Sequence, residues 1–522
     1  MASKSRETRT RLVAARPTSD SRCKTSQPPG AGMGGSPLMA DDGAAGVATP
    51  PSPSKQSRPK PAAQQLTTTM ETAPSSSPSS KTQSLPLSLG VAVDSQLLRQ
   101  VGALEREDYY HGLLPRTDVE GMLLEEGDFL LRRTELTASD GCGGGGGGGA
   151  ERREQFFAIS VRCAGTKTAH VKLLRSPQGR WHIADVGFQD VPALIDYHLK
   201  KRVPVTMDGQ LLKRPVGRQS WQLRHEQIQF DPDRDRLGRG AYGEVYRARL
   251  RHVLKGGAHV DKLVAVKTLT DLSEVTKLDR ERFVQEARLM RKFRHRNVVR
   301  LIGVAAQAEP LMIVMELAPG GSLLSKLHHC GPTLSPRQHA AFCYDAARGL
   351  RYLHRKGCLH RDVAARNCLL GSKDQVKISD FGLTIDARAD SRGQLNEHMV
   401  LPIKWLPPET LSWRQYTDKS DVWAFGVLLW EVWSDGKTPY PGKTNLEARR
   451  HVLDPARSGP PLEAPPGTPS CFCRLLAHCT RRDQGRRPAF AEICAQMRNA
   501  AIASETPPAP TTTTAAAVAA PC

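Results

Sequence analysis

The stretch HRDVAARNCLLGSKDQVKISDFG, residues 360–382, decides the fold. It carries Asp362, then Asn367, and Asp380 after the short alternating run of residues 376–378. A phosphoryl-transfer site needs a carboxylate that takes the proton of the attacking hydroxyl, and oxygen ligands that hold Mg²⁺ against the phosphates of ATP. An isolated Asp is usually a solvated turn residue or a helix cap, but these three side chains at this spacing predict such a site.

This order of residues resembles the catalytic and metal-binding loops of protein kinases. The resemblance implies a bilobal protein kinase fold of the α+β class, with an antiparallel sheet in the N-lobe and helices in the C-lobe. It makes ATP and Mg²⁺ the expected cofactors. Asp362 is then the expected catalytic carboxylate, and Asn367 and Asp380 are the expected metal ligands.

A glycine-rich stretch, LGRGAYGEV, begins at Leu237. Its glycines let backbone amides approach phosphates that a side chain would block, although such a motif alone is weak. It gains weight because VAVK, ending at Lys267, follows at the distance that a hairpin partner needs. The resemblance implies that Lys267 pairs with the α- and β-phosphates and that Glu286 orients it; an exposed helix glutamate is the alternative. The expected nucleotide-binding residues are Leu237, Gly238, Gly240, Gly243, Val245, Ala265, Lys267, Glu286, the gatekeeper Met315, and Glu316 and Ala318 of the hinge.

Apolar periodicity predicts the helices of the C-lobe. The helix before the catalytic loop shows one apolar face, which comprises Phe342, Ala346, Leu350 and Leu353. Residues 422–433 are apolar nearly all round, which predicts a buried helix capped by Ser420 and Asp421. The resemblance adds an ion pair between Glu409 and Arg487 that anchors the activation segment.

Two features indicate a phenolic hydroxyl as the acceptor. Arg366 lies two residues further along than the lysine in the D-x-K-x-x-N motif of serine/threonine kinases, a placement that suits a longer substrate. Residues 401–405, LPIKW, resemble the platform on which tyrosine kinases hold the substrate ring. The expected catalytic residues are therefore Asp362, Lys267, Arg366 and Asn367.

A second folded segment opens with YYHG at residues 109–112. Val119, Met122 and Leu123 recur at helical spacing, residues 129–134 and 157–161 read as strands, and residues 191–199 show a second amphipathic helix. A helix, a central antiparallel sheet and a second helix predict a small α+β domain. Residues 109–205 resemble the SH2 domain, a phosphotyrosine-binding module.

The SH2 resemblance assigns Arg132, in the strand FLLRRT, to the phosphate of phosphotyrosine, which it grips bidentately. Arg116, Thr134 and His170 match the supporting positions of that family. An arginine inside an apolar strand is costly without an anionic partner, so a buried structural ion pair is the alternative. Arg133 stands where an acidic residue is common, and the glycine tract 143–149 is inserted after the phosphate-binding loop.

An SH2 domain followed directly by a tyrosine kinase resembles the Fes/Fer group of non-receptor kinases, over residues 105–500. The expected division is a disordered, basic Ser/Pro-rich arm (1–104), an SH2 domain (105–205), a linker (206–225), a kinase domain (226–500) and a disordered tail (501–522). Both ends have too few bulky apolar residues to offset the entropy of ordering the backbone. Residues 1–100 are too few for the long membrane-curving helical domain of that group, so membrane bending is not expected.

The activation segment departs from the family pattern. Such kinases usually carry a tyrosine whose phosphate pairs with the arginine beside the catalytic Asp, here Arg361. No tyrosine lies between residues 382 and 405, and the family position falls on Arg392. An exposed ion pair from Asp386, Asp390 or Glu397 is worth about 0.2–1 kcal/mol, against about 5.5 kcal/mol for a full loop switch. We expect activity to be set by SH2 docking, onto the kinase lobe or onto phosphorylated substrate, and not by phosphorylation of this segment.

The composition limits the partners and the location. The formal net charge of +21 is dispersed and aromatics are 5% of residues, so no nucleic-acid binding is expected; weak attraction to acidic membranes is retained. No apolar run reaches the roughly 18 residues of a membrane span, and the N-terminus lacks a signal core and the glycine for myristoylation. Twelve scattered cysteines are expected to be reduced and, by default, buried, Cys471 and Cys473 included. A cytoplasmic location, peripheral at the membrane at most, is expected.

The sequence therefore predicts a non-receptor protein tyrosine kinase in signal transduction. It would transfer the γ-phosphoryl of ATP to protein tyrosines and would bind phosphotyrosine proteins through SH2. A catalytically weak or inactive SH2–kinase scaffold is the alternative, against which the intact Lys267, Asp362, Asn367 and Asp380 argue.

Overall fold

The computed structural model describes residues 95–136, 154–240, 243–253, 259–269, 277–388, 401–456 and 459–505. The predictions for residues 1–94, the glycine tract 143–149, residues 506–522, and Asp390, Arg392 and Glu397 lie outside the described residues. Within them, no helix is long and apolar enough to cross a membrane.

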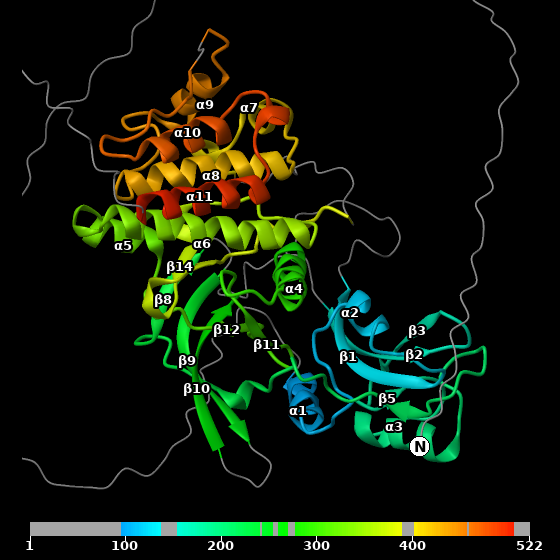
Figure 1. Ribbon diagram of the computed structural model, residues 1–522. Coiled ribbons are helices and arrows are strands. Elements are labelled where there is room, and N and C mark those ends of the chain that lie inside the picture. Colours follow the sequence, from blue (N-terminus) through cyan, green and yellow to red (C-terminus); the bar gives the residue numbers. More distant parts are fainter. Residues whose placement is uncertain are drawn as a thin grey trace, which may run out of the picture. The chain divides into compact units, whose positions relative to one another are not determined.

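The N-terminal module is a four-stranded sheet with helices. Its elements are α1 (Ser95–Leu104), α2 (Arg116–Glu120), β1 (Asp128–Leu136), β2 (Glu154–Arg162), β3 (Thr168–Lys172), β4 (Leu174–Arg175), β5 (Trp181–His182), α3 (Val191–Lys201) and β6 (Arg214–Pro215) (Figure 1). The sheet order is β3-β2-β1-β6, in which β1, β2 and β3 are antiparallel and β6 is parallel to β1. The predicted helix, antiparallel sheet and second helix are all present.

Both faces of this sheet are buried, because side chains alternate along each strand. Phe129 and Leu131 of β1 join one core cluster with Leu194 and Ile195 of α3. Leu130 faces the other way and packs with Val119 of α2. By the same alternation Arg132 lies on the α2 face of the sheet, and it is buried there.

The predicted limits of this module are wrong at both ends. Val101 and Leu104 of α1 are buried in its core, so residues 95–104 do not belong to a disordered arm. Leu212 is buried in the same core and Arg214 pairs with Asp128, so the first part of the expected linker completes the sheet. The first helix ends at Glu120, so Met122 and Leu123 follow it rather than belong to it. A short helix and a two-residue strand gain their stability from packing, which periodicity alone does not reveal.

A six-stranded antiparallel sheet forms the next part of the chain. It comprises β7 (Ile228–Gln229), β8 (Arg236–Gly240), β9 (Gly243–Val253), β10 (His259–Thr268), β11 (Leu301–Ala305) and β12 (Met312–Glu316). The order is β11-β12-β10-β9-β7, and β8 pairs with β9. The predicted hairpin is present, since Lys267 lies opposite Val245, and Ala265 lies opposite Met315 on β12. One helix, α4 (Lys277–Arg291), accompanies this sheet.

The C-terminal part is largely helical. Its helices are α5 (Leu323–Cys330), α6 (Pro336–Arg355), α7 (Pro408–Trp413), α8 (Asp418–Trp433), α9 (Asn445–Leu453), α10 (Ser470–Cys479) and α11 (Phe490–Glu505) (Figure 1). Two short antiparallel pairs are present: β13 (Cys358–Leu359) pairs with β16 (Ile385–Asp386), and β14 (Cys368–Leu370) pairs with β15 (Val376–Ile378). Two 3₁₀ turns matter for the site, η4 (Ala365–Asn367) and η6 (Ile403–Trp405).

The predicted helix faces of this lobe are confirmed, with two corrections. Phe342, Ala346, Leu350 and Leu353 of α6 are all buried, and α8 is buried along nearly its whole length. The cap of α8 is Thr417, whose hydroxyl accepts from Lys419 N, and not Ser420 or Asp421. Helix α11 runs to Glu505, so the expected disordered tail does not begin at 501.

The nine cysteines of the described residues are free thiols. Five of them are buried, as expected, but Cys471 and Cys473 of α10 are only half-buried. The default interpretation of these two as buried thiols is therefore wrong.

Candidate active site

Lys267 of β10 is buried between two carboxylates. Its Nζ donates to both oxygens of Glu286, at 2.9 and 2.8 Å, and lies 3.5 Å from Asp380 Oδ1. Burial disfavours the ammonium, but Glu286 and then Asp380 more than offset this and hold the pKa of Lys267 above its ordinary value. Glu286 is itself buried on α4, so the alternative of an exposed helix glutamate is wrong.

Asp380 lies at the junction of this pair with the catalytic loop. Its backbone has a φ of +60°, a conformation that few residues other than glycine adopt. The side chain is exposed, with 49% of it accessible to solvent. The enclosing protein favours the neutral carboxyl, but Lys267 first and His360 second hold the pKa of Asp380 below its ordinary value. A charged carboxylate therefore faces the opening of the site.

Asp362 is oriented by two donors from its own loop. Arg366 Nη2 donates to Asp362 Oδ1, and Asn367 Nδ2 donates to Asp362 Oδ2 at 2.6 Å and to the Asp362 carbonyl at 2.8 Å. The turn η4 brings these side chains together, because it places residues 365–367 one tight turn beyond Asp362. Three of the predicted site residues therefore form one hydrogen-bonded group.

Phe381, beside Asp380, packs beneath this group. Its ring is buried and lies 5.2 Å from the Phe293 ring and 5.5 Å from the His360 ring, between centroids. His360 Nε2 is 3.0 Å from the Ser379 carbonyl, a distance at which the N–H tautomer donates to it. Because one aromatic stack contacts both loops, the catalytic loop and the segment around Asp380 are held together by apolar packing.

Asp421 of α8, which the sequence predicts as a helix cap, is a residue of the site. It is fully buried and accepts from His360 N at 2.9 Å, Arg361 N at 3.0 Å and the Tyr416 hydroxyl at 2.9 Å. Desolvation favours the neutral acid, but the hydrogen bond and charge of His354 and the further donors hold the pKa of Asp421 below its ordinary value. It fixes the backbone of the loop whose Arg361 has a φ of +69°.

Glu431, ten residues further along α8, is a second residue that the motifs did not reveal. Its Oε2 accepts from Ala365 N and from Trp405 Nε1, each at 3.0 Å. Burial with only these donors raises the pKa of Glu431 to about 7. The Arg366 guanidinium lies 4.4 Å above the Trp405 ring. Glu431 therefore links the catalytic loop to the 401–405 platform.

The glycine-rich strand and its neighbours form the expected nucleotide side of the site. Gly238 pairs with Val245, and a Cβ on Gly243 would lie 1.9 Å from the Thr268 carbonyl oxygen, so the chain cannot carry a side chain there. Leu237 is exposed and Ala265 is buried, whereas Met315 is half-buried near the end of a strand whose first three residues are buried. Gly320 and Gly321 follow the hinge residues Glu316 and Ala318 and bond to Leu370.

Leu369 is a further candidate that sequence reasoning missed. It lies in the middle of β14, two residues after Asn367, and is partly buried against the main core. Its neighbours in sequence, Cys368 and Leu370, are buried. Its partly exposed side chain is a candidate apolar surface of the site, close in sequence to Asn367. The signal was present in the sequence as CLL but has no polar chemistry to mark it.

The residues present fit a magnesium ion that is completed by phosphate oxygens. Ser379 N and Oγ both donate to the Asn367 carbonyl at 2.9 Å, which joins Asn367 to the strand that ends at Asp380. Within the described residues no three His, Cys, Asp or Glu side chains cluster as a complete metal cage. Mg²⁺ usually needs only one or two carboxylates and takes its other ligands from waters and substrate phosphates. Asn367 and Asp380 are the residues that would hold it.

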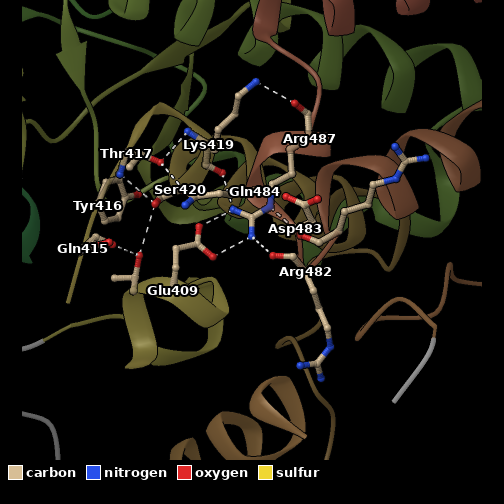
Figure 2. A network of polar contacts seen from close by, with 12 residues as sticks. Glu409, Gln415, Tyr416, Thr417, Lys419, Ser420, Arg482, Asp483, Gln484 and Arg487 are labelled. Atoms are coloured by element: carbon tan, nitrogen blue, oxygen red, sulfur yellow. Dashed lines mark hydrogen bonds and ion pairs between the residues drawn. The ribbon is translucent and has the colours of Figure 1, made fainter. Parts of the chain in front are cut away.

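The predicted ion pair between Glu409 and Arg487 is confirmed (Figure 2). Arg487 Nη1 donates to Glu409 Oε1 at 2.6 Å and Nη2 donates to Oε2 at 2.8 Å, and both side chains are buried. Arg487 also donates to the carbonyls of Lys419 and Arg481. The pair is bidentate and fully bonded, which is the condition under which a buried ion pair holds two segments together. It ties α7, just after the platform, to the segment before α11.

The predicted phosphate-binding residues of the N-terminal module also lie together. Arg132 Nε donates to Ser160 Oγ at 3.2 Å, and Ser160 Oγ lies 2.8 Å from His170 Nδ1. Arg132 is 2% exposed, and its Nη2 has no hydrogen-bond partner among the described residues. Burial, and then the charge of Arg116, lower the pKa of Arg132 to about 10. Thr134 follows on the same strand face and is half-buried.

One carboxylate, Glu120, borders this cationic site. Its Oε1 is 3.4 Å from His170 Nε2 and it is half-exposed. Within the described part of the chain it is not hydrogen-bonded to Arg132, so the alternative of a buried structural ion pair has no support among these residues. A buried guanidinium with a free donor suits an anion from outside.

Direct contacts join the N-terminal module to the sheet lobe. Arg288 of α4 donates from Nε and Nη2 to the two oxygens of Asp118 on α2, at 3.0 and 2.8 Å. Leu113 N donates to the Ala306 carbonyl at 2.7 Å, and a Cβ on Gly112 would lie 2.0 Å from that oxygen. Arg291 Cζ lies 3.9 Å from the centre of the Trp221 ring. These contacts reach the helix that carries Glu286.

Comparison with known proteins gives consistent matches. The family model described as protein tyrosine and serine/threonine kinase matches residues 233–497. Fer-related kinase 1 of Caenorhabditis elegans is 38% identical over 398 residues, which is 75% of this chain and 93% of that protein. Tyrosine-protein kinase Fer of Rattus norvegicus is 36% identical over 396 residues, 75% of this chain and 43% of that protein. The tyrosine-protein kinase transforming protein Fps of avian sarcoma virus (strain PRCII) is 35% identical over 390 residues, 74% of this chain and 66% of that protein.

Proposed function

This chain belongs to the Fer/Fps family of non-receptor protein tyrosine kinases, and from that premise we propose that it phosphorylates tyrosines of proteins that its N-terminal module selects as an SH2 domain. The observation that carries the catalytic part is the joint presence of two groups. One is Lys267 between Glu286 and Asp380, and the other is Asp362 held by Arg366 and Asn367.

Asp362 is proposed to accept the proton of the tyrosine hydroxyl. Its two carboxylate oxygens are each held by a donor, Arg366 on one and Asn367 on the other, so the carboxylate is fixed before the substrate arrives. The Arg366 guanidinium also covers the Trp405 ring of the platform. Arg366 therefore contacts both the Asp362 carboxylate and the platform, so a phenol that rests on the platform lies close to that carboxylate.

Lys267 is proposed to hold the α- and β-phosphates of ATP. Because Glu286 and Asp380 keep it charged and directed into the site, no rearrangement is needed when the anion binds. Asn367 and Asp380 would hold Mg²⁺, which neutralises phosphate charge when it is bound. The apolar surfaces of Leu237, Val245, Ala265 and Leu369, with the hinge after Met315, are the proposed adenine site.

The N-terminal module is proposed to bind phosphotyrosine through Arg132, with Arg116, Thr134 and His170 around it. The buried, unpartnered Nη2 of Arg132 supports this, because a phosphate oxygen would supply the missing acceptor. The proposed partners are accordingly phosphotyrosine proteins and tyrosine substrates, with weak attraction to acidic membranes as an addition. A cytoplasmic location belongs to the same proposal.

Regulation is proposed to pass through the contact between Asp118 and Arg288. Asp386, one of the acids considered for the role of the missing phosphate, is paired with Lys292 at 2.8 Å. Thr384 is buried and its hydroxyl donates to the His360 carbonyl at 3.3 Å, so a kinase does not reach it in this conformation. By contrast, Arg288 lies on the same helix as Glu286 and donates directly to Asp118 of the N-terminal module.

The direct test is phosphorylation of a tyrosine peptide by the purified chain, beside Asp362→Asn. Wild type is expected to label tyrosine and not serine or threonine in matched peptides, and the variant is expected to lose at least about a hundredfold in kcat. An inactive scaffold would bind the same phosphopeptides without labelling any peptide. Equal labelling by wild type and Asp362→Asn would remove Asp362 from its proposed role.

A further inference from the structure

Helix α9 presents a face that the catalytic proposal does not use. Ala448 and Val452 bury one side of the helix in the core. The other side carries Leu446, Arg449, Arg450 and Leu453, at positions i, i+3, i+4 and i+7. With Asp454 and Pro455 these side chains line a hollow on the surface. Leu446 is 54% exposed there and supplies apolar surface beside the two arginines.

The hollow is connected to the substrate platform. Ala448 and Val452 of α9 belong to the same apolar cluster as Leu406, and Ile403 and Trp405 of η6 pack against that cluster. Arg449 Nη2 donates to the Leu411 carbonyl of α7 at 3.2 Å, which fixes α9 to the segment that follows the platform. Trp413, at the end of α7, is 69% exposed. A protein whose tyrosine rests on the platform therefore has α9 beside it.

The charge of the hollow indicates what fills it. Arg449 and Arg450 are exposed on its wall, and Arg482 reaches its rim by donating to the Asp454 carbonyl. The nearby Glu447 is occupied, because its Oε2 accepts from Thr444 N at 2.7 Å and from the Thr444 hydroxyl at 2.9 Å. One carboxylate, Asp454, also lines the hollow, and its Oδ1 accepts from Ala456 N at 3.1 Å. The three guanidinium groups outnumber it around the apolar surface, and guanidinium recognises carboxylates in a bidentate manner.

We propose that the α9 hollow docks an acidic segment of the protein substrate, one with an apolar side chain flanked by carboxylates; this rests on the proposed tyrosine kinase function and deepens it. The chain's own N-terminal arm is basic, and a second copy of a chain of net charge +21 is also basic, so neither complements the arginines. An apolar anchor seats against Leu446 and Leu453, and its neighbouring carboxylates meet Arg449 and Arg450. Docking there holds the substrate without adding to the chemistry of the site.

The test uses the full chain and two tyrosine peptides. One is short, and the other carries an extension of two glutamates, a phenylalanine and two glutamates, attached at either end through Gly-Ser linkers of about 4 to 12 residues, which span roughly 10–20 Å. The extended peptide is expected to show a KM about tenfold lower at equal kcat, because the cost of ordering the peptide offsets part of what one buried apolar side chain and two exposed ion pairs contribute. Leu446→Ser and Arg450→Glu are expected to remove this advantage and leave the short peptide unchanged.

Matched controls and a rescue make the outcome specific. Leu124→Ser and Lys201→Glu change exposed residues of the other module in the same way and are expected to keep the advantage. Arg450→Glu is expected to prefer an extension in which lysines replace the glutamates. An advantage that is absent at every linker length, or that persists in both α9 variants, overturns the proposal. So does a change of oligomeric state in Leu446→Ser, since the hollow would then be an interface between copies.

A binding measurement separates this proposal from the catalytic one. The extension alone, labelled and without tyrosine, is expected to bind wild type and to bind Leu446→Ser and Arg450→Glu about tenfold more weakly. No binding of the extension by a chain that labels the short peptide overturns the docking proposal alone. Binding of the extension by a chain that labels no tyrosine peptide overturns the kinase function on which the proposal rests, and the docking proposal with it.

Discussion

Lys267 and Arg132 are both buried cations on sheet strands, but they differ in what neutralises them. Lys267 contacts Glu286 at 2.8 and 2.9 Å and Asp380 at 3.5 Å, and its pKa is raised. Arg132 has a hydroxyl at 3.2 Å and the cation Arg116 nearby, and its pKa is lowered to about 10. The first cation is balanced before any ligand binds. The second is held in an unfavourable state that an anion from outside would relieve.

The largest expected effect concerns the balanced cation. Lys267→Met should lower peptide phosphorylation by about a hundredfold or more and leave a folded protein, because one charge is lost from a site that works by positioning and electrostatic stabilisation. Turnover is measured with the same tyrosine peptide used for wild type. Near-normal turnover would show that Lys267 does not contact the phosphates.

The control for Lys267→Met uses its partner. Removal of the lysine leaves Glu286 buried without its cation, which usually destabilises a protein by about 3–5 kcal/mol. Lys267→Met combined with Glu286→Gln should recover much of that stability and none of the activity. The phosphotyrosine affinity of all these variants should equal that of wild type.

The next effect concerns the unbalanced cation. Arg132→Leu should weaken binding of a phosphotyrosine peptide by about a hundredfold, which corresponds to the loss of two charge-assisted hydrogen bonds at about 1.5 kcal/mol each. Calorimetry with phosphorylated and unphosphorylated forms of one peptide measures this. If wild type bound the two forms equally, the module would not be a phosphotyrosine reader.

The two buried cations differ most clearly in the direction in which their removal should change the free energy of unfolding. Arginine is charged in both folded and unfolded chains at pH 7, and the lowering of its pKa to about 10 in the folded chain corresponds to about 3 kcal/mol of destabilisation. The penalty is fully present below the folded pKa and is relieved as the pH rises through 10. Arg132→Leu should therefore raise the free energy of unfolding, by about 1.5–2.5 kcal/mol once about 0.5–1.5 kcal/mol is deducted for the lost Ser160 bond.

Phosphotyrosine should produce the same rise in wild type without a mutation. Scanning calorimetry of the full chain, with and without free phosphotyrosine, should show a higher first transition for wild type only. Arg132→Leu should start higher and not respond. A variant less stable than wild type would mean that the guanidinium is already paired, against the contrast with Lys267.

The part of this site that could be predicted consists of residues that lie close together in the sequence. Asp362, Arg366 and Asn367 lie within one turn, so their sequence fixes their proximity, and Lys267 is placed by the hairpin from Val245. Asp421 and Glu431 were not found, because they come from a helix some sixty residues away and act on backbone amides that have no motif. Leu369 could not be predicted, because an apolar residue has no polar or reactive group that distinguishes a binding site in the sequence.

The fold shows the same division. The apolar face of α6 follows from its helical periodicity, and the burial of α8 follows from its apolar composition nearly all round. The ends of the helices and strands depend on tertiary contacts, which cannot be read from the sequence alone. Thr417, and not Ser420, caps α8. Helix α1 is stabilised because Val101 and Leu104 pack into the core that β1 and α3 form. Local signals gave the elements, and tertiary contacts set their limits.

The smallest expected effect concerns the contact between the regions that hold the two cations. Asp118→Asn should lower peptide phosphorylation by about threefold to tenfold, since coupling through such a contact is worth about 0.5–2 kcal/mol. Asp118 is buried against Arg288, whereas Arg288 is partly exposed, which places the pair above a surface bridge and below a fully buried one. Arg288→Ala should give at least this loss, since Arg288 also donates to Thr117 and Gln285. The double variant should lose little more than Arg288→Ala, because both changes remove the bonds between Asp118 and Arg288.

The same preparation tests whether this contact replaces the missing activation-segment tyrosine. Treatment of wild type with a tyrosine phosphatase should leave peptide phosphorylation unchanged, whereas deletion of the N-terminal module should lower it at least as much as Asp118→Asn does. A large loss after dephosphorylation, traced by mass spectrometry to Thr384, Ser391 or a tyrosine elsewhere in the kinase lobe, would show that a covalent switch operates. Burial of Thr384 beneath the His360 carbonyl argues against that residue, because its hydroxyl becomes accessible only if the segment leaves β13.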